Sequence, residues 1–289
     1  MKRAIRRFVG KLHGKNKYLF FVTLILVCII AICLGIYIQF FYKYSDTDPL
    51  MLGIKIGSQK TAEEYAILKS EFNNLFTNDI KINSENVRVD KIEPSNDLVY
   101  TGYNLVNQDE NYYSVNAQVP VINIDTDKAK QINGEIKSEF YDKVNAIMRQ
   151  TENNTVYTVS YAAFVNEHIL SIVIKSSLKE DGKSEKVVVK TYNYSMAEEK
   201  LLSLKDLINL KQTDSQTVQA SIKNDIKTAY NNAKIIAEEY GVLYERDLEN
   251  DMYLVENTTT FFLTQEGYVY IVYAYGNYDY TNEIDLIIF

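Results

Sequence analysis

Residues 155–194 read TVYTVSYAAFVNEHILSIVIKSSLKEDGKSEKVVVKTYNY, and this stretch decides the fold. Its apolar positions are rich in β-branched and aromatic side chains, which is typical of strands. They form three runs, 155–165, 168–176 and 186–194. Only Asn166-Glu167 separates the first two runs, and the charged loop 179–183 precedes the third. Because parallel neighbours need a long crossover connection, these short loops predict an antiparallel meander.

In three segments around the meander, apolar residues recur at the spacing of an α-helix. Apolar side chains recur three or four positions apart from residue 61 onward, over 127–148 and over 215–240, which predicts amphipathic helices. Thr61 followed by Glu64 matches a capping box at the first helix start. Gly241 stands where a helix-terminating glycine belongs, directly after the third helix.

Alternating apolar and polar residues predict further strands on both sides of the meander. One is 112–124, where Pro120 indicates a sheet edge or a bulge, because proline cannot donate a ladder hydrogen bond. Four more are expected near the C-terminal end: 252–255, 259–263, 268–275 and 284–289. The sequence therefore predicts an α+β fold, with antiparallel sheets and helices packed on one face.

The N-terminal region predicts a membrane anchor. The run 18–42 has no charged residue, and seven Lys or Arg and no acid precede it. About 20 apolar residues span a bilayer as a helix, and flanking cations stay on the cytoplasmic side. The run is too long for a secretory signal and lacks a small-residue cleavage site. We therefore expect a single-pass cell-membrane protein with a cytoplasmic N-terminus and an extracellular C-terminal domain.

The expected organisation has five parts. They are a basic cytoplasmic tail (1–17), a transmembrane helix in contact with the lipid bilayer (18–42), a stalk with an N-terminal helical segment (43–97), and two α+β modules (98–200 and 201–289).

The expected outer part is acidic and free of thiols. The chain has 31 Lys and Arg against 38 Asp and Glu; without the seven cations of the tail, 24 remain against 38, a net charge of about −14. Such a charge repels nucleic acid and favours cationic partners through electrostatic steering. Both cysteines, Cys28 and Cys33, lie in the membrane run, so no disulfide is expected outside.

Signatures of catalysis are few. Of two histidines, His13 belongs to the tail and His168 begins a predicted strand just after the hairpin turn, where a surface or turn role is expected. With one histidine and no cysteine outside, a zinc site of the usual composition is excluded, and no nucleophile elbow, P-loop or dinucleotide motif occurs. We expect no enzyme, no metal and no cofactor. Carboxylates alone can hydrolyse glycosides, so a carboxylate-based wall hydrolase remains an alternative.

The densest acidic stretch, 245–251, is one candidate partner surface. Its four acids could dock a basic protein or a divalent cation, although their spacing does not fit a calcium-binding loop. A solvated loop is the alternative. The acids are Glu245, Asp247, Glu249 and Asp251.

Tyrosines near the C-terminal end are the second candidate surface. Tyr268 and Tyr270 share one face of a predicted strand, while Tyr273 and Tyr275 share the other. Tyrosine supplies a large contact area at low entropic cost. One face is therefore expected in the core, and the face of Tyr273 and Tyr275 is either packed or a recognition surface.

The order of several short segments resembles a known family. The segments are Ser114–Val121, Lys130–Ile136, Leu170–Ile174, Val188–Tyr194, Leu202–Leu207, Phe261–Thr264 and Tyr273–Gly276. Between Leu105 and Phe289 this order is similar to the paired extracellular module of the anti-sigma-V factor of Gram-positive bacteria. A related module lies ahead of the catalytic domain in membrane-anchored peptidoglycan deacetylases. The resemblance implies a non-catalytic α+β ectodomain, which in the anti-sigma factor binds lysozyme.

These observations favour a binding or sensing ectodomain that faces the cell wall. Its partner is expected to be a cationic protein such as lysozyme, or peptidoglycan and other wall material. The alternative is a structural or assembly protein that contacts other membrane proteins.

Overall fold

The structure, a computed structural model, describes residues 60–76, 88–94, 97–152, 154–240 and 243–289. All of these belong to one compact unit, Leu52–Phe289. The predicted tail, membrane run and first part of the stalk lie outside the described residues. Within the ranges given above, no helix combines the length and apolar character needed to cross a bilayer.

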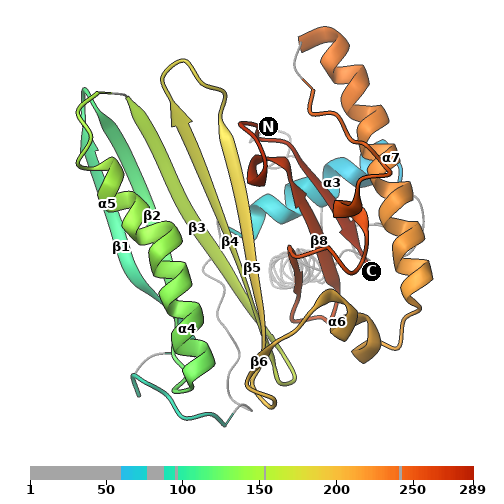
Figure 1. Ribbon diagram of the computed structural model, residues 1–289, viewed down its shortest axis with the longest axis horizontal. Helices are drawn as coiled ribbons and strands as arrows, with labels where there is room; N and C mark the ends of the chain where they lie inside the picture. The colour runs from blue at the N-terminus through green and yellow to red at the C-terminus, as the bar shows by residue number, and fades with distance from the viewer. Residues whose placement is uncertain (1–59, 77–87, 95–96, 153, 241–242) are drawn as a thin grey trace, which may run out of the picture. The chain divides into compact units, whose positions relative to one another are not determined.

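The larger sheet has six strands that follow one another in chain order (Figure 1). They are β1 (Val99–Asp109), β2 (Tyr113–Ile122), β3 (Thr155–Asn166), β4 (Ile169–Glu180), β5 (Lys186–Ser195) and β6 (Lys200–Leu201). The antiparallel meander predicted for β3, β4 and β5 is confirmed. The turn is shifted by one residue to Glu167-His168, because Asn166 pairs with Ile169 and Glu167 adopts a φ of 52°.

One pair of strands departs from the purely antiparallel prediction. β2 and β3 are parallel where Tyr113–Ala117 face Thr155–Val159. The connection between them contains helices, and such a crossover returns the chain to the end of the sheet where it began. Pro120 lies beyond this paired stretch, opposite a register shift between Thr101 and Tyr103, so the predicted bulge is confirmed.

A helical layer covers one face of the six-stranded sheet (Figure 1). Its parts are α4 (Asp127–Ile136), a π-helical turn η1 (Lys137–Tyr141) and α5 (Asp142–Ile147), which together confirm the helix predicted over 127–148. The hydroxyl of Thr126 caps α4 by accepting a hydrogen bond from the Ala129 amide at 3.2 Å. The predicted apolar stripe of this helix is buried against the sheet.

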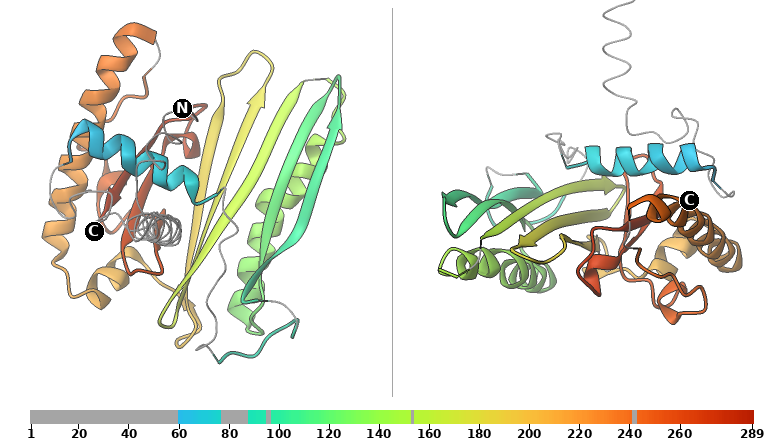
Figure 2. Two further views of the ribbon diagram at one scale, coloured as in Figure 1. Left: turned by 180° about the vertical axis from the view of Figure 1, so that it is seen from behind. Right: turned by 90° about the horizontal axis from the view of Figure 1, so that it is seen from above.

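The second sheet has three antiparallel strands near the C-terminal end: β7 (Phe261–Leu263), β8 (Val269–Ala274) and β9 (Ile284–Ile288). One face packs against α6 (Leu204–Leu210) and α7 (Ser215–Tyr240). The other face packs against α3 (Ala62–Asn74) and against the side of the large sheet opposite α4 and α5. Figure 2 shows α3 on this opposite side.

Two further details of the prediction are wrong. Helices lie on both sides of the sheets and not on one face, because each of the two sheets has two apolar faces to cover. The predicted strand 252–255 begins in the 3-10 turn η2 (Asp251–Tyr253), which starts where the Asn250 side chain accepts the Met252 amide. The capping box of Thr61 and Glu64 and the helix over 215–240 are confirmed.

Polar side chains join β7 to the large sheet. The Asn193 amide donates to the Phe261 carbonyl at 2.7 Å, and the Ser171 hydroxyl accepts from the Leu263 amide at 3.1 Å. Asn277, in the 3-10 turn η3 (Tyr275–Asn277), forms two 3.1 Å hydrogen bonds with the backbone of Val189. These bonds fix the small sheet against β4 and β5 and set the spacing of the site described next.

Candidate ligand-binding groove

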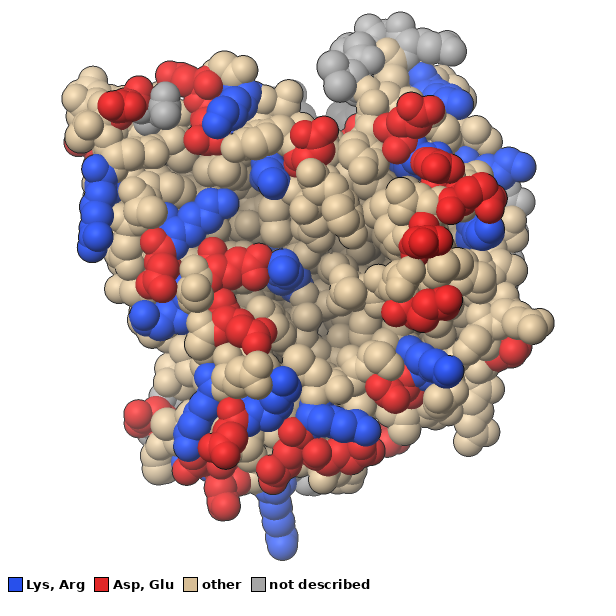
Figure 3. Space-filling model, in the orientation of Figure 1, with Lys and Arg blue, Asp and Glu red and all other residues tan. Residues whose placement is uncertain are grey.

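A groove of about 1150 Å³ lies between the α4–η1–α5 layer and the end of the small sheet. Figure 3 shows it as a hollow in the middle of this face, bordered by residues of both charges. Its lining comes from segments more than 100 positions apart, including α4, β5 and η3. We call it the central groove.

The floor of the central groove is the part of the large sheet that the helical layer leaves open. Val188, Lys190 and Tyr192 alternate along β5 and so point to the same face. Tyr157 on β3 and Ser176 on β4 continue the floor. Burial raises the pKa values of Tyr157 and Tyr192, so both phenols remain protonated at neutral pH.

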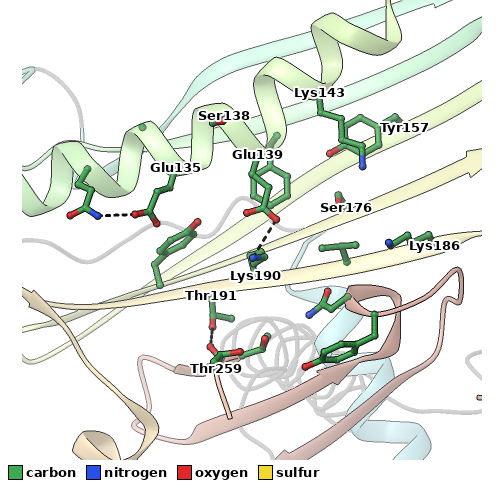
Figure 4. Close-up of a pocket in the computed structure, with 18 residues that line it drawn as sticks. Glu135, Ser138, Glu139, Lys143, Tyr157, Ser176, Lys186, Lys190, Thr191 and Thr259 are labelled. Carbon is green, nitrogen blue, oxygen red and sulfur yellow. Dashed lines mark hydrogen bonds and ion pairs between the residues drawn. The ribbon is translucent and has the colours of Figure 1, made fainter. Parts of the chain in front are cut away.

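The helical wall carries hydrogen-bonding and acidic side chains (Figure 4). On α4, the Gln131 amide donates to the Glu135 carboxylate one turn later, at 3.0 Å. On η1, Glu139 reaches the floor and forms an ion pair with Lys190, with 3.5 Å between Oε1 and Nζ. This wall is therefore polar where the opposite side of the same helix is apolar.

The opposite wall comes from the C-terminal part of the chain. Thr259 and Thr260 precede β7, and the Thr191 hydroxyl of β5 donates to the Thr259 carbonyl at 3.4 Å. Tyr278 follows η3 and has 61% of its surface exposed, so its ring forms an aromatic rim. The groove thus combines aromatic rings with amide, hydroxyl, ammonium and carboxylate groups.

Tyr273 and Tyr275 are in the core. They are 5% and 0% exposed and pack with α6 and α7. Their hydroxyls are hydrogen-bonded inside the domain, Tyr273 to Thr258 at 2.9 Å and Tyr275 to Asp285 at 2.8 Å. The predicted alternation of the strand is correct, but this face is packed and presents no surface for recognition.

The four acids of 245–251 are all exposed. Among the ion pairs of the described residues, Glu249 is the only one of these four acids that takes part: Lys223 Nζ lies 3.5 Å from its carboxylate. They lie apart from the central groove, whose lining contains none of them. Their role as a partner surface stays a prediction. In the part of the chain that the structure describes, no group of three His, Cys, Asp or Glu is placed to hold a metal ion.

Reasoning from the sequence missed the central groove. Its residues form no motif, and only the fold brings Glu139, Lys190 and Tyr278 to one place. A partial signal was present in β5, where Lys186 and Lys190 lie on the same face as Val188 and Tyr192. His168, in the β3–β4 turn, is exposed, as expected for a turn residue.

Comparison with known proteins gives few leads. No protein-family model and no curated protein sequence matches the chain. It is similar to a DUF3298 family protein of Pseudomonas aeruginosa PAO1 at 17% identity and a TM-score of 0.37, over 63% of this chain and 83% of that one. It is also similar to a DUF3298 family member of Bacteroides fragilis NCTC 9343, at 12% identity and a TM-score of 0.32, over 61% and 80%.

Proposed function

We propose that the protein is a membrane-anchored, non-catalytic binding protein whose outer domain holds wall material in the central groove. The observation that carries the proposal is the groove itself. Its volume of about 1150 Å³ exceeds the roughly 300–1,000 Å³ of small-molecule pockets. A segment of a polymer fits this size better than a small metabolite does.

The chemistry of the lining supports a polar polymer as the ligand. Tyr278 offers aromatic surface on the rim, while Gln131 and Ser138 offer groups that donate and accept hydrogen bonds. A glycan presents apolar ring faces together with many hydroxyls, and so suits both kinds of group. Location outside the cytoplasm is part of this proposal and rests on the charge pattern of residues 1–42.

The binding test uses the full-length protein in detergent and fragments of peptidoglycan. We expect saturable binding by the wild type. Binding should weaken about tenfold in Tyr278→Ala, because the ligand would lose the exposed ring on which it stacks. Gln131→Ala should weaken binding, while Gln216→Ala, an exposed helical glutamine on α7, should leave it unchanged. Equal binding by all variants, or no binding by the wild type, would contradict the groove as the site.

The remaining parts of the proposal have separate tests. Protease added to intact cells should degrade the C-terminal domain; full protection would contradict an outside location. Purified protein should release no soluble products from peptidoglycan. If the wild type releases soluble products and Glu139→Gln does not, the protein is a carboxylate-based hydrolase and the non-catalytic proposal is wrong.

A second candidate function is supported by the exposed acids. Glu245, Asp247 and Asp251 have no ion pair among those found in the described residues, so they can accept a cationic protein such as lysozyme. Binding of lysozyme that falls steeply with salt and is lost in Asp247→Asn/Glu249→Gln would establish this function. Crosslinking in cells to a fixed membrane partner would instead favour the assembly role.

A further inference from the structure

Two lysines meet at one end of the central groove. Lys143 extends from α5 toward the floor, and its ammonium lies 5.0 Å from the centre of the Tyr157 ring (Figure 4). Lys186 comes from the start of β5, and its ammonium lies 5.2 Å from the centre of the Tyr280 ring. Ser176 lines the same part of the floor. Three strands and a helix therefore place two cations beside one patch of hydroxyl groups.

Neither lysine is neutralised by an ion pair in the described part of the chain. Nearby lysines differ in this respect, since Lys190 pairs with Glu139 at 3.5 Å and Lys183 pairs with Glu180 at 2.9 Å. The unpaired state of Lys143 and Lys186 is notable in a protein with 38 acids against 31 cations. Two like charges held together without a counter-ion repel each other, and a bound anion would remove that cost.

Charges of both signs face Lys143, and burial is the largest influence on its pKa. Burial and the Lys186 charge lower the pKa of Lys143, and the carboxylates of Glu180 and Glu139 oppose this effect only in part. Lys143 is also half-buried, between the helix and the sheet. An anion that reaches Lys143 would leave bulk water. Its charge-assisted hydrogen bonds would be stronger there than in water, because the surroundings of a half-buried group are less polar.

We propose that Lys143 and Lys186 form an anion subsite of the central groove, which binds a phosphate or carboxylate group carried by the wall polymer. The inference rests on the proposed function of the groove and names the chemical class of its ligand. Two ammonium groups with rotatable donors suit a multi-oxygen anion, and Ser176 lines the same part of the groove.

Three oligomers of matched length test the subsite against the full-length protein in detergent. They are a glycerol phosphate oligomer, an oligosaccharide of glucuronate and N-acetylglucosamine, and a neutral oligomer of N-acetylglucosamine. We expect at least one anionic oligomer to bind more tightly than the neutral one, with affinity that falls as salt rises. The anionic oligomer that binds tighter identifies whether phosphate or carboxylate is the natural group.

Substitutions then assign the effect to the two lysines. Lys143→Gln and Lys186→Gln should each weaken the anionic oligomer about tenfold and leave the neutral oligomer unchanged. Lys186→Arg should retain most of the affinity, because it keeps the charge. The matched control is Lys205→Gln, which removes an exposed lysine on α6, outside the groove. Thermal unfolding of each variant checks that the fold is intact.

The possible failures are distinct. If the neutral oligomer binds as tightly as the anionic ones, or if both glutamine variants bind anions like the wild type, the subsite is refuted and the groove remains. If none of the three oligomers binds while peptidoglycan fragments do, the subsite is refuted and the proposed function stands; if peptidoglycan fragments fail as well, both are contradicted. If Lys205→Gln weakens binding as much as the groove variants, the effect comes from overall charge and the subsite is refuted.

Discussion

At Arg246 a full positive charge lies inside the domain, with 3% of the residue exposed. Its guanidinium binds Asp285 on β9 through two hydrogen bonds, of 2.7 and 3.1 Å, and binds Glu283 at 2.7 Å. The Tyr275 ring lies 4.6 Å from the guanidinium carbon and its hydroxyl donates to Asp285. Arg246 thus fixes the acidic segment 245–251 to the small sheet.

Replacing this arginine should be among the most damaging single changes. Arg246→Met leaves Asp285, which is 0% exposed, without its counter-ion. We expect the free energy of unfolding to fall by about 3–5 kcal/mol, the usual cost of removing one partner of a buried ion pair. Urea unfolding measures it, with Arg149→Met, at an exposed arginine, as the control. A loss below 1 kcal/mol would show that the pair is dispensable.

A second buried pair gives a pH dependence. Lys60, just before α3, binds Asp225 on α7, and both side chains are 1% exposed. Burial raises the pKa of Asp225 even with the Lys60 ammonium beside it. A carboxyl whose pKa is raised by folding contributes full stability below its unfolded pKa of about 3.9 and loses it as the pH rises through the folded pKa.

Removing the ammonium should enlarge this effect. We expect Lys60→Met to lose stability as the pH rises from 4 to 7, because the Asp225 carboxyl must then ionise without a counter-ion. The double variant Lys60→Met/Asp225→Asn should lack this added slope. Urea unfolding at several pH values measures both. Parallel pH curves for the two variants would show that the Asp225 charge is not responsible.

Among the elements, β5 and η3 matter most for the site. β5 supplies the floor of the central groove, and η3 is held against it by Asn277 and by the close approach of Gly276. A Cβ atom at Gly276 would lie 1.9 Å from the Val187 carbonyl oxygen, which is backbone and cannot rotate away. The absence of a side chain therefore lets the two elements touch.

Gly276→Ala should separate η3 from β5. We expect a loss of about 1–3 kcal/mol in unfolding free energy, as for overpacking, together with weaker binding in the groove. Gly134→Ala is the matched comparison: this glycine lies in α4, and an added Cβ meets nothing within 4 Å. It should stabilise the protein by up to about 1 kcal/mol, because alanine is the better helix former. A Gly276→Ala variant that is as stable as the wild type would contradict the packing described at η3.

The elements also show what the sequence could predict. The strands β3 to β5 and the helix α7 follow clear apolar periods, and so their positions could be read from the chain. β1 was missed because most of its side chains are exposed and alternate weakly. The parallel pairing of β2 and β3, the two-sided helices and the meeting of Glu139 with Lys190 depend on contacts distant in sequence, which local periodicity does not encode.

The described unit as a whole has three hydrophobic cores, which are formed by the two sheets and the helices that cover them. The α4–η1–α5 layer and the large sheet enclose one core, α6 and α7 enclose another on the small sheet, and α3 closes the junction between the sheets. The central groove lies where the helical layer ends and the small sheet begins. Binding there would bridge both sheets, whereas binding at 245–251 would contact only the segment attached to β9.

Photocrosslinking distinguishes these two locations directly. A photoreactive phenylalanine analogue replaces Tyr278 at the groove, Glu249 in the acidic segment, or Ile235, which is 69% exposed on α7. Full-length protein in detergent is then irradiated with peptidoglycan fragments. The account predicts adducts from the position of Tyr278 and none from the other two positions. Adducts from the position of Glu249 alone, or equally from all three positions, would contradict a ligand site in the central groove.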